Sequence, residues 1–295
     1  MPMQLRRPGS RAGGPGMTGP TEPSRYDLPL APDPDHDLSV DEVRVLWSFI
    51  HGDIMNSQFR ARLRAHHGPC ERHAWAYAVT EIELWEQGAG RRGGHQPFDV
   101  AVLYTDLLEE MSTRLRRQRR RRRDRILRRD GTCLICDDVR GRQPTRFVVT
   151  HAGFDPAKLA AEANRMRYTI AWLRETAPCW SPLVCPDCTD QPTTTGAAIR
   201  CRPHLVLHHA DLTDHVLHSE LDALDLWTAR LRALLGSMTA GGRPSTPEED
   251  AAWVAAVAWF NGWRFPLTVV PPIPNDRSRD TGSRSTTRPS ASPDQ

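Results

Sequence analysis

Cys185-Pro186-Asp187-Cys188, followed after twelve residues by Cys201-Arg202-Pro203-His204, is the stretch that decides how this chain folds. Three thiols and one imidazole form a complete ligand set for a tetrahedral zinc ion, and a gap of two residues lets each pair bind one ion from a single turn. Four protein ligands leave no coordination position open for water or substrate, so the site is expected to be structural. The residues predicted to bind this metal are Cys185, Cys188, Cys201 and His204.

A second set of the same ligand types lies upstream, with the order of the two pairs reversed. It consists of Cys70-x-x-His73 and Cys133-x-x-Cys136, so that only Cys179 among the seven cysteines has no place in a pair. We predict a second zinc site at Cys70, His73, Cys133 and Cys136. The alternative is a buried Cys70, a surface His73 and a reducible Cys133-x-x-Cys136 pair. An exchange of partners between the two sets also stays open.

The upstream site sets a condition on the path of the chain. Fifty-nine residues separate His73 from Cys133, so the intervening chain must return to the point where it started. We therefore expect helices at residues 71–85 and 98–115 to pack antiparallel.

Local sequence around the two sets indicates a common geometry. Gly131 precedes one Cys-x-x-Cys pair, and Pro186 and Asp187 lie inside the other, which is the turn chemistry of a zinc knuckle. Each Cys-x-x-His pair begins an apolar run of helical character, starting at Ala74 and at Leu205. A knuckle joined to the first turn of a helix is a treble-clef-like site. The predicted fold class is therefore mainly α, with zinc knuckles at helix junctions.

These motifs resemble an uncharacterised family of helical actinobacterial proteins. The resemblance is carried by Gly68-Pro69-Cys70-Glu71-Arg72-His73-Ala74-Trp75 and by Cys185-Pro186-Asp187-Cys188 with Cys201-Arg202-Pro203-His204-Leu205. That family repeats Cys-Pro-x-Cys, a helical stretch and Gly-x-Cys-x-x-His, and the resemblance covers residues 38–236. It implies zinc-stabilised helices and no established reaction. This chain has no Cys-x-x-Cys ahead of Cys70, so either Cys133 and Cys136 supply that half or the upstream site has decayed.

Composition divides the chain into a central region and two ends. Residues 1–36 are rich in Pro, Gly and Arg, and residues 271–295 in Ser, Thr, Pro, Arg and Asp. We expect both ends to be disordered, because they cannot bury enough apolar surface to offset the entropy of ordering. The helical zinc-binding region is then 37–270, with possible sub-domains at 37–150 and 151–270.

The sequence also favours one compartment. It shows no secretory signal and no run of about 18 apolar residues, so secretion and membrane spanning are not expected. Cysteines in metal-like pairs suit a reducing compartment, and we expect a cytoplasmic protein.

The positive charge of this protein is concentrated in one segment, Arg114–Arg129. Eleven arginines and one aspartate give that segment a charge of +10, so the rest of the chain carries −7 of the net +3. Charge of this density would attract nucleic-acid phosphates strongly and without regard to sequence. The residues predicted to contact DNA or RNA are Arg114, Arg116, Arg117, Arg119, Arg120, Arg121, Arg122, Arg123, Arg125, Arg128 and Arg129.

Periodicity places this segment at the end of one long helix that Pro97 opens. An apolar stripe from Val100 stops at Leu115, and arginine then covers every face for about two turns. Such a stretch cannot pack, so it is expected to lie in water or against an anionic surface. The alternatives to nucleic acid are a solvated helix end and an acidic protein or lipid surface. No aromatic residue interrupts the run, which argues against stacking of single-stranded bases.

Capping signals predict further helices. Ser39 with Glu42 forms a capping box, Asn56 can cap a short helix, and Ser245-Thr246-Pro247-Glu248 opens a last one. Apolar periodicity adds helices at 157–176 and 212–235. Strand signals are confined to 146–150 and 267–270. Histidines near the downstream set, at positions 208, 209, 215 and 218, are interpreted as helix-surface residues rather than as a further metal site.

Together these features favour a protein that works by binding. The sequence has no glycine-rich phosphate loop, nucleophile elbow or dinucleotide fingerprint, and we do not expect an enzyme. DNA or RNA is the favoured partner. The alternatives are an adaptor of the same fold that contacts a protein through the acidic remainder of the chain, and a redox sensor based on zinc thiolates.

Overall fold

Helices form every regular element of the part of the chain that the structure describes. The structure is a computed structural model, and it describes residues 36–50, 56–84, 96–129, 131–141, 155–189, 199–208 and 212–270. All of them belong to one unit, Pro32–Gln295. The described residues contain no strand, which confirms the prediction of a mainly α fold. The two ends that were expected to be disordered, apart from His36, lie outside the described residues.

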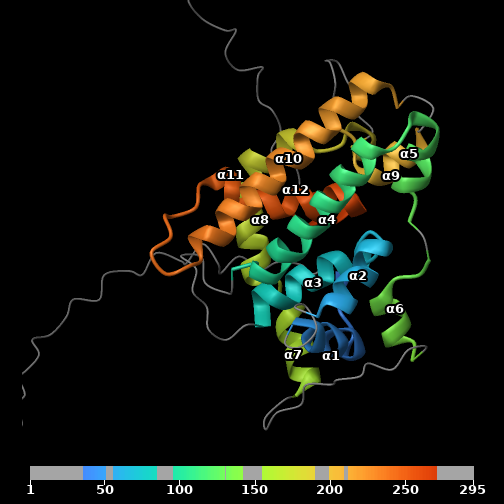
Figure 1. Cartoon of the computed structure of the whole chain (residues 1–295). Helices are drawn as coiled ribbons and strands as arrows, with labels where there is room; N and C mark the ends of the chain where they lie inside the picture. The colour runs from blue at the N-terminus through green and yellow to red at the C-terminus, as the bar shows by residue number, and fades with distance from the viewer. Residues whose placement is uncertain are drawn as a thin grey trace, which may run out of the picture. The chain divides into compact units, whose positions relative to one another are not determined.

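Thirteen α-helices and two short 3-10 turns follow one another along the described chain (Figure 1). They are α1 (Val40–Ser48), α2 (Ser57–Ala65), α3 (Glu71–Leu84), α4 (Phe98–Arg117), α5 (Arg120–Leu127), α6 (Leu134–Val139), α7 (Pro156–Ala163), α8 (Arg167–Trp180), η3 (Ser181–Leu183), η4 (Pro186–Cys188), α9 (Arg202–Leu207), α10 (Asp214–Ser237), α11 (Pro247–Asp250), α12 (Ala252–Asn261) and α13 (Arg264–Val269).

The predicted caps are confirmed. The Ser39 hydroxyl accepts from the backbone of Glu42, and the Glu42 carboxylate accepts from the backbone of Ser39, which closes the capping box of α1. Asn56 caps α2, and Thr246 forms a second capping box with Glu249 at α11. These side chains satisfy backbone N–H groups that the first turn of a helix leaves unpaired.

The core is built around α12, which is buried on every side. All ten of its residues are buried, as expected for a helix that is apolar all round. It contacts α3, α4, α8, α9, α10 and α11, and Figure 1 shows it enclosed by them. The largest helix-to-helix interface in the described residues joins α4 and α10. The predicted contact between α3 and α4 exists, but α10 is the main partner of α4.

Three predictions of secondary structure are wrong. The long helix ends at Arg117, because Gln118 and Arg119 are extended, with ψ of 143° and 149°, before α5 begins. The break separates arginines that would repel one another at helical spacing. The helix predicted at 157–176 is interrupted before α8, at Met166, which has a left-handed φ of 47°.

The third correction concerns the strand signals. Residues 267–269 belong to α13 instead of a strand, because an isolated short apolar run with no partner strand packs equally well as a buried helix. Residues 146–150 lie outside the described part of the chain. None of the described helices is both long enough and apolar enough to span a lipid bilayer.

Candidate metal centres and arginine surface

The upstream ligand set comes together in space. The ligand atoms of Cys70, His73, Cys133 and Cys136 all lie within 4.8 Å of one another. His73 Nδ1 is 3.4 Å from the sulfur of Cys70, 3.6 Å from that of Cys133 and 3.3 Å from that of Cys136. The sulfurs of Cys70 and Cys136 are 3.8 Å apart. We call this cluster the upstream centre.

The downstream set forms a second cluster of the same kind, the downstream centre. Its members are Cys185, Cys188, Cys201 and His204, again within 4.8 Å of one another. His204 Nδ1 lies 3.3 Å, 3.4 Å and 3.1 Å from the three sulfurs in that order. The Cys188 and Cys201 sulfurs are 3.7 Å apart. No exchange of partners between the two sets occurs.

These spacings are those of a tetrahedron around one ion. Zinc bonds of about 2.3 Å to sulfur and about 2.0–2.1 Å to nitrogen put two sulfurs about 3.8 Å apart and a sulfur and nitrogen about 3.6 Å apart. The observed distances are 3.7–3.8 Å and 3.1–3.6 Å. All seven cysteines are free, and a disulfide would require about 2.05 Å. Both donor sets therefore fit a divalent ion with four protein ligands, and Cys179 lies in α8 outside both.

Each centre joins a knuckle to the beginning of a helix. In the upstream centre Cys133 is the N-cap residue of α6, and His73 lies in the first turn of α3. In the downstream centre Cys185 precedes η4, and Cys201 is the N-cap residue of α9, which carries His204. The backbone N–H of Cys70 donates to the Cys133 sulfur at 3.3 Å. The arrangement is the treble-clef-like one predicted from the sequence.

Glu42 orients the histidine of the upstream centre, a role that the sequence analysis missed. Its Oε1 lies 3.0 Å from His73 Nε2 and 2.6 Å from Arg72 Nε. An Nε2–H that donates to this carboxylate leaves Nδ1 free to bind a metal. Burial alone would raise the pKa of Glu42, but hydrogen bonds from His73, Arg72 and Ser39 outweigh it and hold that pKa well below its usual range. From sequence Glu42 was visible only as a capping residue, because its contact with His73 spans 31 positions.

His204 has no such partner. Within the described residues, no side chain forms a hydrogen bond with the Nε2 atom of His204, and no carboxylate contacts its ring. The downstream sulfurs are nevertheless well shielded, since Cys185 and Cys201 are 0% and 1% exposed. The two centres thus share their ligands and differ in what supports them.

Without a cation, neither cluster can hold all of its thiols ionised. Hydrogen bonding to Cys70 lowers the pKa of Cys133 to about 3. Hydrogen bonding to Cys185 raises the pKa of Cys188 to about 11, and burial adds to this effect. Each set therefore pairs a thiol of lowered pKa, Cys133 or Cys185, with one of raised pKa, Cys70 or Cys188, and a divalent cation would displace the remaining protons.

The arginine segment is partly bound into the fold, which corrects the prediction that such a stretch cannot pack. Arg116 pairs with Asp225, Arg123 with Asp214 at 2.6 Å, and Arg128 with Asp124 at 2.9 Å. Only 14% of the Arg123 side chain is exposed. These pairs exist because α10 and the segment's own Asp124 bring carboxylates to it, which the local charge did not show.

The other arginines divide into three groups. Arg129 donates to the backbone carbonyls of His66, Gly68 and Pro69. The side chains of Arg114, Arg117, Arg119, Arg122 and Arg125 form no hydrogen bond or ion pair within the described residues. The side chains of Arg120 and Arg121 lie outside them.

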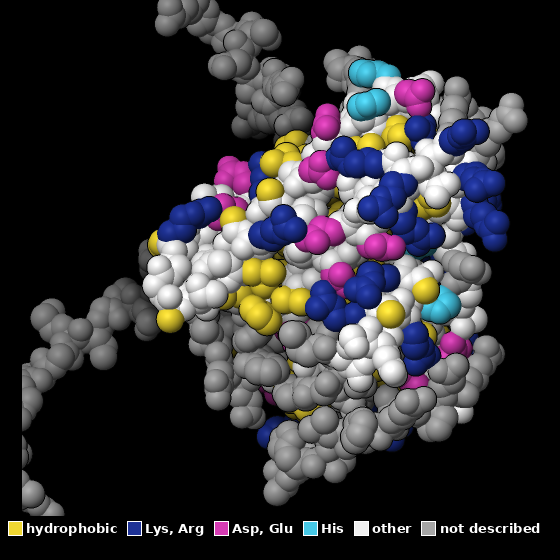
Figure 2. All heavy atoms as spheres, viewed as in Figure 1, with side chains coloured by type: hydrophobic (Ala, Val, Ile, Leu, Met, Phe, Trp, Pro, Cys, Tyr) yellow, Lys and Arg dark blue, Asp and Glu magenta, His cyan; other side chains and the backbone are white. Residues whose placement is uncertain are grey.

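Three of these unpaired arginines, Arg114, Arg122 and Arg125, line a hollow of about 610 Å³. We call it the arginine hollow. It lies where the end of α2 meets the last turn of α4 and the length of α5, and the described residues that line it include no carboxylate. Its lining is Ala65, His67, Arg114, Gln118, Arg122, Arg125, Ile126, Arg128 and Arg129. Figure 2 shows basic side chains gathered over α5, whereas basic and acidic side chains alternate along α4 and α10.

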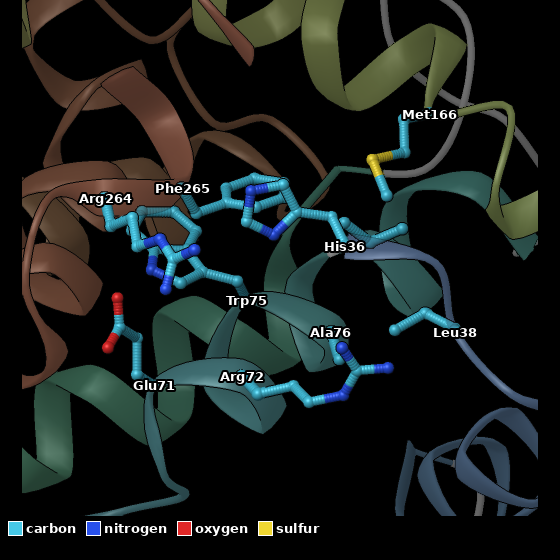
Figure 3. A pocket seen from close by; sticks show the side chains of 10 residues that line it. His36, Leu38, Glu71, Arg72, Trp75, Ala76, Met166, Arg264 and Phe265 are labelled. Atoms are coloured by element: carbon cyan, nitrogen blue, oxygen red, sulfur yellow. The ribbon is translucent and has the colours of Figure 1, made fainter. Parts of the chain in front are cut away.

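A smaller hollow of about 320 Å³ lies beside the upstream centre (Figure 3). Trp75 and Phe265 stack in its wall with ring centroids 5.0 Å apart. Burial raises the pKa of Glu71 there, although Arg264 opposes the shift. Arg72 also lines this hollow and reaches from it to Glu42. The hollow mixes apolar and charged groups, so its lining selects no single ligand chemistry.

The remaining histidines form no further cluster in the described residues. The only groups of three or more His, Cys, Asp or Glu ligands placed to share an ion there are the two centres. His218 Nδ1 lies 2.6 Å from the Asp214 carbonyl, as a helix-surface residue can. Residues 209–211 lie outside the described part of the chain. Comparison with known proteins adds no family: no family model, curated protein or solved structure matches this chain.

Proposed function

We propose that the protein is a zinc-stabilised helical binding protein that contacts nucleic acid through its arginine segment. The two centres support zinc by their ligands, since three sulfurs and one nitrogen at tetrahedral spacing suit this ion. Four protein ligands fill each site, so the metal has a structural role and the protein binds rather than catalyses. Thiolate ligands of this kind suit a reducing compartment such as the cytoplasm.

The arginine hollow is the observation that favours nucleic acid as the partner. Five arginines line it and three of them, Arg114, Arg122 and Arg125, have no partner in the described residues. A concave surface of one sign attracts counter-charged ligands strongly. Phosphates along a nucleic-acid backbone supply repeated negative charge at the required density. The hollow presents no groups arranged to read base edges, so the contact is with the backbone.

Binding at two salt concentrations tests this proposal. A labelled DNA or RNA duplex of mixed sequence should bind at low salt, and the affinity should fall steeply as salt rises. In Arg122→Gln/Arg125→Gln the affinity should fall about tenfold, and the slope of log affinity against log salt should shrink by about 2.

The matched control removes the same charge elsewhere. Arg44 pairs with Asp41, and Arg232 pairs with Glu109; both arginines are exposed and neither lines the hollow. Arg44→Gln/Arg232→Gln should bind within about twofold of the parent, because both arginines are already paired with carboxylates and neither lines the hollow. Absence of parent binding at low salt would overturn the nucleic-acid function and leave the adaptor, contacting its partner through the acidic remainder of the chain. Equal losses in both double variants would show that net charge alone is responsible.

A further inference from the structure

Hydrogen bonds connect both metal centres to α5, the helix along which the arginine hollow lies. Resting on the proposed function, we propose that metal binding at the two centres holds α5 in place and so makes recognition of nucleic-acid phosphates by the arginine hollow dependent on the metal. None of the eight metal-ligand residues lines the hollow. The effect of the metal would pass through two arginines, Arg129 and Arg202, whose contacts are described below.

The upstream connection passes through Arg129. This residue follows α5 and donates to the carbonyls of His66, Gly68 and Pro69, the residues directly before Cys70. Four positions later along the chain comes Cys133, which belongs to the same centre as Cys70. A bound ion would therefore join the segment before Cys70 to the segment before Cys133 a second time. Arg129 already joins these two segments by hydrogen bonds, and the metal would join Cys70 to Cys133.

His67 strengthens this connection from the floor of the hollow. It has a left-handed φ of 55°, is 3% exposed, and contacts the Arg128 carbonyl through Nε2 at 2.9 Å. Burial, helped by the charge of Arg202, lowers the pKa of His67 to about 4. The ring is therefore neutral at pH 7, and its Nε2–H can donate to that carbonyl without adding a buried charge.

The downstream connection passes through Arg202, which lies between two ligands, Cys201 and His204. Its Nε donates to the Phe260 carbonyl at 3.0 Å and its Nη1 to the Leu127 carbonyl at 2.7 Å. Leu127 is the last residue of α5, and Phe260 lies in the last turn of α12. The guanidinium thus stabilises the carbonyl ends of both helices. It is 7% exposed and does not line the arginine hollow.

These contacts matter because α5 would be marginal by itself, although Ile126 and Leu127 are buried and Arg123 pairs with Asp214. It has eight residues and no side-chain cap at its N-terminus, and most of its residues are arginine. Like charges at helical spacing destabilise a helix, and one this short is marginal in isolation. Besides this packing, its conformation depends on the Arg202 contact at its end and on the loop that Arg129 and His67 hold.

The test uses Arg202→Gln, because this residue supports α5 without touching the hollow. The matched control is Arg200→Gln, which removes the same charge two positions away, where Arg200 pairs with Asp187 at 3.0 Å. Both variants are compared with the parent at equal zinc content, with a short labelled DNA duplex as the probe. Arg202→Gln should bind about tenfold more weakly, the loss expected when a charged hydrogen bond that orders a site is removed. Arg200→Gln should stay within about twofold of the parent.

Two further readouts separate positioning from charge. Amide hydrogen exchange across 120–129 should become faster in Arg202→Gln and stay unchanged in Arg200→Gln. Removing zinc from the parent with a chelator should weaken binding, and adding zinc back should restore it. If both Arg202→Gln and the chelated parent bind the duplex as tightly as the zinc-loaded parent, the coupling is wrong and the nucleic-acid function stands. If the parent binds nothing at low salt, the proposed function itself fails.

Discussion

The two centres use the same ligands but depend on the fold in different ways. In the downstream centre twelve residues separate the two ligand pairs, whereas in the upstream centre the separation is 59 residues. The downstream pairs can therefore meet through local structure. The upstream pairs meet only when α4 and α5 have brought the chain back. The downstream ligands are thus brought together by their proximity in sequence, and the upstream ligands by tertiary packing.

The two centres also differ in whether a distant side chain supports the histidine ligand. The upstream histidine is held by Glu42, which belongs to α1 and lies 31 positions away. No comparable side chain supports His204 within the described residues. On the downstream side the buried carboxylate of Glu220 accepts from the backbone of Arg200 at 2.8 Å and from Trp259 Nε1 at 3.0 Å. Glu42 orients the ligand His73, whereas Glu220 holds the backbone of Arg200, the residue before the ligand Cys201.

Loss of a ligand should have the largest effect, and the effect should be greater upstream. Cys133→Ser and Cys185→Ser should each remove one zinc and cost more than about 4 kcal/mol of unfolding free energy, because metal binding contributes directly to folding. The upstream loss should exceed the downstream one by about 1.4 kcal/mol, since a bound ion there closes a loop about five times longer. Zinc analysis and urea unfolding of both variants measure these quantities. Equal losses would remove the distinction between a local and a tertiary centre.

Glu42→Gln should weaken only the upstream centre. Loss of a carboxylate that orients a histidine ligand typically lowers metal affinity by about 10- to 100-fold. A chelator competition that resolves the two zinc ions should show one released more readily and the other unchanged.

The chain offers a closely matched control, Glu249→Gln. Glu249 also completes a capping box, pairs with Arg243 and is 8% exposed, against 6% for Glu42, but it contacts no ligand of either centre. If both variants change zinc affinity equally, the Glu42 contact to His73 has no role in metal binding.

The smallest expected effect is on the pH dependence of stability, through Glu220. Burial raises the pKa of this carboxyl to about 7, although hydrogen bonds from Arg200 and Trp259 oppose the shift. Because the pKa is raised above its unfolded value, the stabilising contribution is complete below about pH 4.5 and is lost as pH rises towards 7. Between pH 6 and 7 the parent should lose up to about 1.4 kcal/mol relative to Glu220→Gln. Parallel stability curves for the two proteins over this range would contradict the shift.

Sequence predicts the parts of this molecule that depend on short spacing. The ligand pairs were identified because two residues separate their members, and the caps at Ser39, Asn56 and Thr246 were identified because capping is local. The mainly α class followed from apolar periodicity. Each of these features is decided within a few residues, so tertiary structure did not alter it.

The features that sequence missed depend on contacts between distant segments. The break at Gln118 separates α4, which packs on α10, from α5, which contacts α9. From sequence Arg202 was assigned no role, yet its contact with Leu127 spans 75 positions. Glu42 was read as a cap alone. Such roles become visible only when the partner is known, because nothing in the local sequence distinguishes these residues from surface charges.

The central claim is that three sulfurs and one nitrogen hold zinc at each of two centres. Elemental analysis of the reduced protein, combined with X-ray absorption at the zinc edge, tests it most directly. We expect two zinc ions per chain, with an average shell of three sulfurs at about 2.3 Å and one nitrogen at about 2.0–2.1 Å. Fewer than one zinc per chain, or a shell dominated by oxygen, would contradict it.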